Sequence, residues 1–405
     1  MSNLLARRFL MALTAIAISV QCVFSPSVAA PPSSGLPQAD PAQVGMDPAP
    51  LAQIAPAMQQ SVNDGEAGGV VTLLARQGRV VHIEAVGYAD VESKRPMRTD
   101  TIFAIASMSK PITATAVMVL ADEGKLKVDD PVAQYLPEFA DAALESGKPN
   151  RPITLRDLMT HTSGLTGSQQ NEGTLAETVK KLAARKLQSQ PGEKWQYSPG
   201  LSVCGRVVEV VSGQPFERFL QDRIFGPLEM VDTTFFPTPE QQTRIAKLYK
   251  PGAAKGTLEA TTHWLSDLTP DRTPNPSGGL FSTAPDMVRF YQMVLNRGEL
   301  DGKRIVSEAA VREMSTIHTG ELTAGFTPSC GWGLGWGIVD KPEDVTRMLS
   351  PGTFGHGGAF GTQGWIDPER RMIFVLMIQR SGFGNGDRSP IREKFQELAV
   401  KAVKE

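Results

Sequence analysis

Two serines and a lysine lie close together in the segment AIASMSKPIT, residues 104–113, and could carry out nucleophilic catalysis. Ser107 and Lys110 form the only Ser-x-x-Lys of the chain, a pattern that would arise by chance about once or twice at this length. On a helix, residues three apart share a face at about 5–6 Å, so the Lys110 amine can reach the Ser107 oxygen, whereas Ser109 points elsewhere. A serine hydroxyl needs a base, and burial favours a neutral lysine that can serve as one. We predict Ser107 as nucleophile and Lys110 as its base; the alternative is a solvated lysine near a helix start.

A tyrosine in the segment WQYSPG, residues 195–200, is the next candidate. Tyr197 is one of five tyrosines in the chain and sits in a predicted turn. A tyrosine beside a Ser–Lys pair can relay a proton to the leaving group. The alternative is a loop aromatic that packs on the core.

A glycine-rich segment, FGHGGAFG at residues 354–361, precedes a predicted strand. Adjacent glycines let another backbone or a substrate approach closely, and His356 could be a hydrogen-bonding partner in a cleft. The alternative is a tight turn with a surface histidine. The glycines do not match GxGxxG and no helix follows, which argues against a nucleotide site, and the chain has no GxSxG nucleophile turn.

Strand-like segments near both ends of the chain flank a helical middle, and these elements must position the candidate residues. The clearest patterns predict β-hairpins at residues 69–90 and 361–380, the latter with its turn at Pro368–Arg371, and a helix that ends at Gly124. We expect an α+β fold in which an antiparallel sheet, built from both chain ends and flanked by helices, carries a large, mainly helical insertion. The expected α/β domain comprises residues 46–110 and 300–405, and the helical domain comprises residues 111–299.

The first 30 residues have the pattern of a secretory signal peptide. Two arginines precede an apolar run too short for a comfortable membrane span, and small residues follow, with cleavage expected after Ala29 or Ala30. The alternative is an N-terminal anchor, and RRFLM also loosely fits a twin-arginine export signal. Residues 31–45 are polar and proline-rich and predict a tether. We therefore expect an exported protein, periplasmic or secreted, without a stable membrane span after cleavage.

The charge balance and the placement of histidines and cysteines limit the partners and metal sites that we expect. With 41 Lys and Arg against 43 Asp and Glu, the net charge is −2, which offers no basic excess to hold nucleic acid. The five histidines are scattered and no cysteine belongs to a CxxC pair, so we expect no metal site. Cys204 and Cys330 remain after the signal peptide, and the sequence leaves open whether they form a disulfide or two buried thiols. It also leaves the oligomeric state open.

The three motifs, in this order, resemble those of the serine β-lactamase and penicillin-binding-protein superfamily, most closely the class C β-lactamases and the related family VIII carboxylesterases. The resemblance covers about residues 40–400. Ser107 and Lys110 match the family's Ser-x-x-Lys, and Tyr197 matches the tyrosine of its Tyr-x-Asn. His356–Gly358 occupies the Lys-Thr-Gly position as His-Gly-Gly. The stretches LMTHTSGL (158–165), GGLFSTAPDM (278–287) and WGLGWGI (332–338) also resemble family segments.

The resemblance implies acyl transfer with no metal or organic cofactor. Ser107 would attack a carbonyl carbon, Lys110 and Tyr197 would take its proton, and Tyr197 would pass it to the leaving group. Main-chain N–H groups would stabilise the oxyanion, and water activated by Tyr197 would then hydrolyse the acyl-enzyme. The residues expected to bind the oxyanion or the substrate are Ser107, His356, Gly357, Gly358 and Ala359.

Two departures from the family pattern concern substrate recognition. Pro199 replaces the Asn of Tyr-x-Asn and offers no side-chain amide. His356 replaces the Lys of Lys-Thr-Gly and is mostly neutral near pH 7, so a fixed cation facing a substrate carboxylate is lost. Both losses favour an uncharged ester over a penicillin or a peptidoglycan stem. Three aromatic residues close to the motifs could line an apolar acyl pocket or simply pack in the core: Trp195, Phe360 and Trp365.

We therefore predict an exported serine hydrolase that cleaves carboxylic esters through an acyl-enzyme on Ser107. A weak β-lactamase and a D-amino-acid peptidase or amidase are alternatives within the enzyme class. A non-catalytic homologue that binds acyl or peptidoglycan ligands is an alternative of another class. Retention of the Ser, Lys and Tyr together argues against that last reading, because a binding protein has no need for the three. Transfer of the acyl group to an alcohol instead of water remains open.

Overall fold

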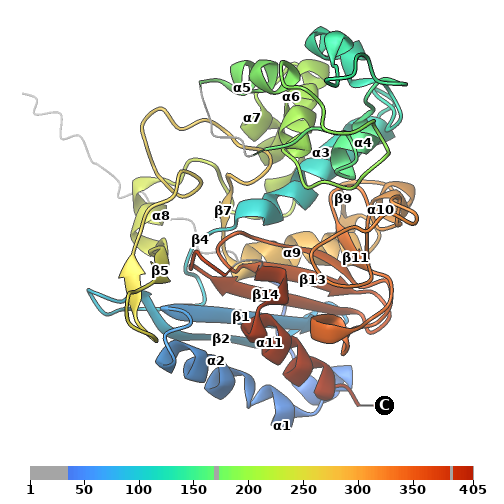
Figure 1. The fold of residues 1–405 in the computed structure, drawn as a ribbon. Coiled ribbons are helices and arrows are strands. Elements are labelled where there is room, and N and C mark those ends of the chain that lie inside the picture. Colours follow the sequence, from blue (N-terminus) through green and yellow to red (C-terminus); the bar gives the residue numbers. More distant parts are fainter. Residues whose placement is uncertain (1–34, 168–172, 384–385, 405) are drawn as a thin grey trace, which may run out of the picture. The chain divides into compact units, whose positions relative to one another are not determined.

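Both ends of the chain contribute to one antiparallel sheet. A computed structural model describes residues 35–167, 173–383 and 386–404, so the predicted signal peptide lies outside the described residues. The sheet has eight strands in the order β10-β11-β12-β13-β14-β1-β2-β3 (Figure 1). In chain order they are β1 (Gly69–Arg76), β2 (Arg79–Asp90), β3 (Arg95–Pro96), β10 (Cys330–Trp332), β11 (Gly337–Val339), β12 (Phe354–Gly357), β13 (Gln363–Asp367) and β14 (Met372–Ile378). The antiparallel pairing of β1 with β14 joins the two ends, as predicted for this α+β fold.

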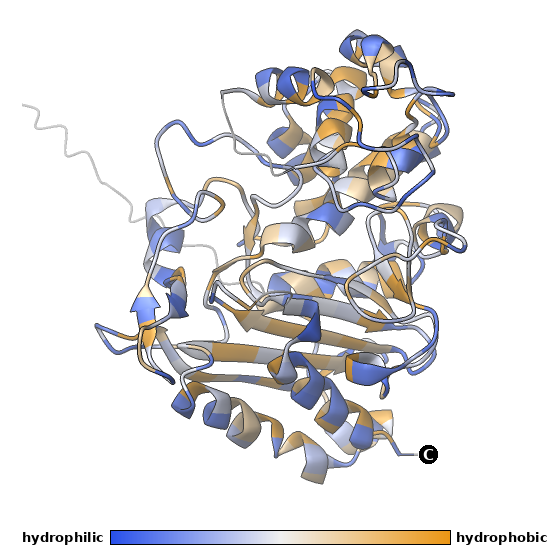
Figure 2. Ribbon diagram, viewed as in Figure 1, coloured by the Kyte–Doolittle hydropathy of each residue, from blue (hydrophilic) through white to orange (hydrophobic). Residues whose placement is uncertain are grey.

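Both predicted hairpins are confirmed: β1 pairs with β2, and β13 pairs with β14 across the turn at Pro368–Arg371. The central strands are apolar on both faces because helices cover both. Along β1, Val71 and Leu73 join one core cluster, whereas Val70 and Leu74 join another. This alternation follows from the two-residue period of a strand. Figure 2 shows the hydrophobic colour running through these strands.

Helices cover the sheet on its two faces (Figure 1). α1 (Pro48–Leu51), α2 (Ile54–Asn63) and α11 (Pro390–Lys401) form one layer, in which α2 contacts β1 and β2, and α11 contacts β14. α9 (Ala284–Leu295) contacts β1, β13 and β14 and belongs to the opposite core cluster. The helical insertion therefore does not extend to residue 299 as predicted, because α9 buries its apolar face on the sheet.

The helical middle surrounds α3 (Ser109–Asp122), in which every residue from Ser109 to Leu120 is buried. The predicted helix end is confirmed: Gly124 follows with a left-handed φ of 68°. The other helices are α4 (Leu155–Met159), α5 (Leu175–Ala183), α6 (Gly200–Ser212), α7 (Phe216–Leu220), α8 (Pro239–Arg244) and α10 (Glu308–Met314). Short strand pairs connect them: β4 (Phe103–Ala104) with β7 (Phe281–Ser282), β5 (Tyr249–Pro251) with β6 (Leu258–Ala260), and β8 (Glu299–Leu300) with β9 (Lys303–Arg304). One hydrophobic cluster runs from the sheet through α9 into α3 and α6, so the described residues form one compact unit.

The predicted tether is wrong for the residues that the structure describes, 35–45. Leu36 and Val44 are buried, and the main chain of Ala39 and Pro37 bonds Val80 of β2 at 3.0 and 2.9 Å. Asp40 caps a 3₁₀ turn at Pro41–Val44. Proline and a capping aspartate preform a turn as readily as they extend a linker, and the apolar residues between them decide that it packs. Within the described ranges, no helix is long and apolar enough to cross a membrane.

Candidate active site

Ser107 lies at the sharp connection between β4 and α3. Ala106, directly before it, has a left-handed φ of 44°, which is uncommon for a residue with a Cβ, and residues 106–108 form a 3₁₀ turn. Ser107 is the one residue of the run 101–120 that is not buried. Ser109 donates through Oγ to the Ala106 carbonyl at 2.7 Å, so it bonds locally, as predicted. The turn thus leaves Ser107 half-buried and buries Ser109.

The Lys110 amine is buried and lies 3.2 Å from Ser107 Oγ. Its Nζ also donates to the Ser277 carbonyl at 2.7 Å. Burial lowers the pKa of Lys110 from 10.5 to about 7, because removal from water penalises the charged form. A neutral amine that donates one hydrogen to Ser277 keeps its lone pair for the Ser107 proton. The geometry therefore suits a base.

Tyr197, from the loop before α6, joins this pair. The Lys110 amine lies 4.6 Å from the centre of the Tyr197 ring. A hydrogen bond from Ser107 lowers the pKa of the Tyr197 hydroxyl, but burial has the larger effect and raises it well above its usual range. The Tyr197 hydroxyl therefore keeps its own proton near neutral pH. It suits a relay that gives one proton as it takes another, and Lys110 is the better primary base.

His356 lies beside Tyr197 as a buried, neutral ring. Its Nδ1 is 2.7 Å from the Gly357 carbonyl, which can only accept, so Nδ1 carries the proton and Nε2 is an acceptor 3.4 Å from the Tyr197 hydroxyl. Burial, followed by the positive charge of Lys110, lowers the pKa of His356 to about 3. The alternative of a surface histidine is wrong, because the side chain is buried and the Trp332 ring centre lies 5.4 Å from that of His356.

The glycines after His356 permit the close approach that their sequence predicts. A Cβ on Gly358 would lie 2.5 Å from the Ile105 carbonyl oxygen, and one on Gly357 would lie 1.9 Å from Asp387 Oδ1. Gly358 N–H donates to the Thr362 carbonyl at 2.7 Å. The connection from β12 to β13, which includes the exposed Ala359, is therefore held against the main chain just before Ser107.

A cavity of about 350 Å³ opens over Ser107, Lys110 and Tyr197. Its walls mix apolar and small polar groups, and Lys110 is the one ionisable amine, carboxylate or guanidinium among its described lining residues. The remaining lining residues are Gly167, Ser198, Pro199, Trp264, Leu265, Asn275, Ser277 and Gly278. Sequence reasoning missed Trp264, Leu265 and Asn275, which come from a Pro- and Gly-rich loop with no regular pattern. It also missed Ser277, which acts through its main-chain carbonyl and leaves no side-chain signal.

The three aromatic residues near the motifs do not line this cavity. Phe360 and Trp365 are core residues, 1% and 2% exposed. Trp195 packs edge-on against Phe326, at 5.6 Å between ring centres, beside Tyr197. Cys204 and Cys330 are free thiols, and burial raises the pKa of both, that of Cys330 to about 11.

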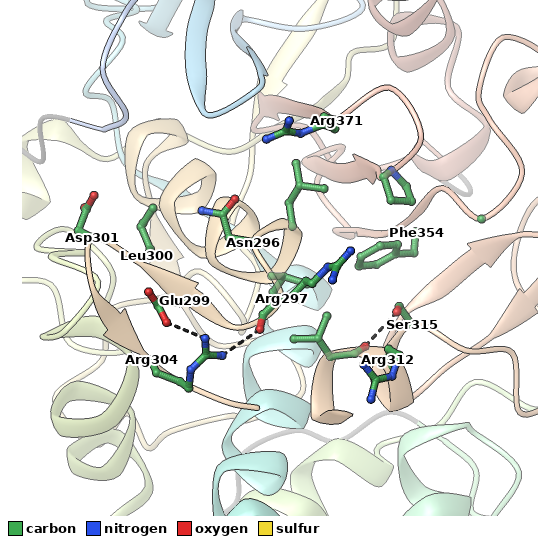
Figure 3. A pocket seen from close by; sticks show the side chains of 15 residues that line it. Asn296, Arg297, Glu299, Leu300, Asp301, Arg304, Arg312, Ser315, Phe354 and Arg371 are labelled. Atoms are coloured by element: carbon green, nitrogen blue, oxygen red, sulfur yellow. Dashed lines mark hydrogen bonds and ion pairs between the residues drawn. The ribbon is translucent and has the colours of Figure 1, made fainter. Parts of the chain in front are cut away.

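A second, larger cavity of about 850 Å³ lies between the end of α9, the β8–β9 hairpin and α10 (Figure 3). Three of its four arginines have carboxylate partners: Arg304 pairs with Glu299, and Arg297 and Arg312 share Glu308. Arg304 also donates to the Arg297 carbonyl just after α9. These contacts are typical of helix C-termini, where cations offset the exposed carbonyls. None of the residues predicted for catalysis lines this cavity.

Comparison with known proteins shows the family to which the chain belongs. The model of the Beta-lactamase family matches residues 54–398. Esterase EstB of Burkholderia gladioli is 30% identical over 375 residues, which cover 84% of this chain and 93% of EstB. Penicillin-binding protein 4 of Amycolatopsis lactamdurans is 35% identical over 272 residues, 65% of this chain and 68% of the relative. The structure of EstCE1, a hydrolase with promiscuous acyltransferase activity, superposes with a TM-score of 0.78 at 26% identity and covers 87% of this chain and 99% of EstCE1. With a half-buried serine beside a buried lysine and a family match over residues 54–398, the chain belongs to the Beta-lactamase family and is a serine hydrolase of that fold.

Proposed function

We propose that this chain is an exported serine esterase that cleaves small uncharged carboxylic esters through an acyl-enzyme on Ser107. The observation that carries the proposal is the buried Lys110 amine, 3.2 Å from the hydroxyl of the half-buried Ser107 in a cavity with no other ionisable amine, carboxylate or guanidinium among its described lining residues. The names of EstB and EstCE1 support hydrolysis and, for EstB, ester cleavage.

The reaction would proceed in two steps, acylation of Ser107 and hydrolysis of the acyl-enzyme. Lys110 takes the Ser107 proton as Oγ attacks the ester carbonyl carbon, and the tetrahedral oxyanion accepts hydrogen bonds from the main-chain N–H groups of Ser107 and Ala359. Each such donor is typically worth about 3–4 kcal/mol of barrier. The carbonyl re-forms as the bond to the alkoxy oxygen breaks, and Tyr197 gives its hydroxyl proton to the departing alcohol as it takes the proton held by Lys110. Water then attacks the acyl-enzyme and gives one proton to the same pair, which passes a proton to Ser107 Oγ as the acyl bond breaks and the carboxylic acid leaves.

The preference for an uncharged substrate follows from the cavity walls. A substrate carboxylate would have to leave water for a site whose one cationic group, Lys110, must be neutral to act, so its desolvation would go uncompensated. His356 is neutral and buried and cannot replace a lysine as a counter-charge. Pro199 lines the cavity without a side-chain amide to bond a lactam or peptide. Trp264 and Leu265 offer apolar contact to an acyl or alkyl group.

The assay compares ester and lactam turnover in the purified chain without residues 1–30. Short p-nitrophenyl esters and a chromogenic cephalosporin are measured side by side, with Ser107→Ala as control. We expect ester turnover that is lost in Ser107→Ala. Cephalosporin turnover that exceeds ester turnover would favour a β-lactamase, which the likeness to penicillin-binding protein 4 keeps as the alternative. The absence of all turnover and of a covalent adduct with a phosphonate probe would favour a binding protein.

Export is part of the proposal and rests on the arginine pair, apolar run and small-residue end of residues 1–30. Expression of the full chain in a bacterial host, followed by cell fractionation and mass measurement, tests it. We expect a periplasmic or secreted product shortened by 29 or 30 residues, corresponding to cleavage after Ala29 or Ala30. An uncleaved product in the cytoplasm would refute export.

A further inference from the structure

One histidine outside the predicted set holds both chain neighbours of Tyr197. His161 follows α4, and its carbonyl oxygen accepts from the main-chain N–H of Gln196 at 2.8 Å. Its ring Nδ1 accepts from the main-chain N–H of Ser198 at 3.1 Å. Residues 196 and 198 are thus bonded to the same residue, and Tyr197 between them has little freedom to shift along the chain.

The ring of His161 also supports the Tyr197 ring directly. The two ring centres lie 4.4 Å apart, and Trp332 packs edge-on with its ring centre 5.3 Å from that of His161. His161 is fully buried and has a left-handed φ of 61°. Such a conformation is costly for most residues with a Cβ but is enriched for Asn, Asp and His. Both bonds to the tyrosine loop form with the main chain of His161 in this conformation.

The hydrogen bonds also define the protonation state of His161. Since Nδ1 accepts from a main-chain N–H, the ring proton lies on Nε2 and the ring is neutral. Burial lowers the pKa of His161 well below its usual value, and electrostatic interaction with Lys110 and His356 adds a smaller effect in the same direction. A protonated ring would point an N–H at the Ser198 N–H and place a cation close to Lys110.

We propose that His161 is a positioning residue that fixes the Tyr197 hydroxyl for proton transfer between Ser107 and the leaving group. The inference rests on the proposed acyl-enzyme function. His161 does not line the cavity, so it acts through Tyr197 and not on the substrate. The segment LMTHTSGL contains the residue, but the sequence alone does not indicate this role, because the two bonds join segments 35 or more residues apart.

Paired substitutions test the geometry. Asparagine places an acceptor oxygen where histidine has Nδ1 and tolerates a left-handed φ, whereas glutamine places its polar group nearer Nε2. With a p-nitrophenyl ester, His161→Leu should lower kcat about 100-fold, the scale of a misplaced proton-transfer group, and leave KM within about threefold. His161→Asn should recover most of kcat, and His161→Gln should not. His82→Leu, at a buried histidine on β2, controls for loss of stability alone.

The outcomes separate this proposal from the proposed function. Ester turnover by the wild type that depends on Ser107 establishes the function; a fully active His161→Leu would then overturn only the positioning role. Equal losses in His161→Asn and His161→Leu, matched by equal falls in melting temperature, would also overturn it. A crystal structure of His161→Leu needs no substrate and should show the Tyr197 hydroxyl displaced or in several positions. An unmoved Tyr197 would refute the proposal even if the chain hydrolysed no ester.

Discussion

The pH dependence of ester turnover should report the buried amine of Lys110. At pH 7, a lysine with an ordinary pKa of 10.5 is neutral in roughly one molecule in 3,000, whereas a pKa of about 7 makes it neutral in about half. Burial thus raises the amount of available base by about three orders of magnitude. We expect kcat/KM to rise about tenfold per pH unit up to about pH 7 and then to level off.

This rise in kcat/KM below pH 7, the acidic limb of the pH profile, can be assigned to Lys110 because the pKa values of the neighbouring histidines are lowered. The pKa of His356 is about 3 and that of His161 is well below its usual value. Burial lowers the pKa of His263 as well, so His263→Gln should leave the limb in place. Lys110→Arg keeps a cation that cannot give up its proton and should lose at least about 1,000-fold in kcat/KM. A pH-independent kcat/KM between pH 5 and 9, or a Lys110→Arg variant with more than a tenth of the activity, would contradict a neutral lysine base.

The pH dependence of stability tests the lowered pKa of Lys110 without any substrate. Between pH 7 and 10.5 the unfolded chain binds a proton on Lys110 that the folded chain does not. The free energy of unfolding of the wild type should therefore rise with pH over this window, by up to about 1.4 kcal/mol per pH unit relative to Lys110→Met. Urea titrations at several pH values measure it. Parallel curves for the two proteins would show that the lysine is not held neutral.

Three further substitutions test the surroundings of the nucleophile. Gly358→Ala should lower kcat/KM for esters, since its Cβ would lie 2.1 Å from the Thr362 hydroxyl. Gly302→Ala is the control: its Cβ meets no atom within 4 Å, and it should cost only about 1 kcal/mol of stability through its positive φ. Equal kinetics in the two variants would contradict the close approach at Gly358. Arg272 donates to four main-chain carbonyls, including that of Leu265, which lines the cavity. Arg272→Lys should therefore loosen the cavity wall and raise KM most for esters with long acyl chains. An unchanged dependence of KM on acyl length, from acetate to octanoate, would argue against this role of Arg272. Pro199→Asn adds an amide at a position that lines the cavity and should raise the ratio of cephalosporin to ester turnover; a ratio equal to that of the wild type would weaken our account of substrate choice.

Local sequence patterns were sufficient for the elements with strong periodicity. Both hairpins and the end of α3 were predicted, because alternation and glycine placement act over a few residues. The extent of the helical insertion was not, since α9 has an apolar face that could equally cover helices or a sheet. The packing of residues 35–45 was also missed, because a proline-rich composition is shared by linkers and by tight turns.

The sequence by itself determined that Ser107 and Lys110 share a local face, since three residues of helical chain bring their side chains together wherever the helix lies. Only the tertiary structure decided that the amine is buried, with its pKa lowered to about 7, because the atoms that exclude water from it come from distant segments such as the Ser277 loop. The same holds for Tyr197, whose position depends on His161, and for His356, whose neutrality depends on burial under Trp332. The approach of the serine hydroxyl to the amine follows from local spacing, whereas the protonation state of the amine arises from long-range packing.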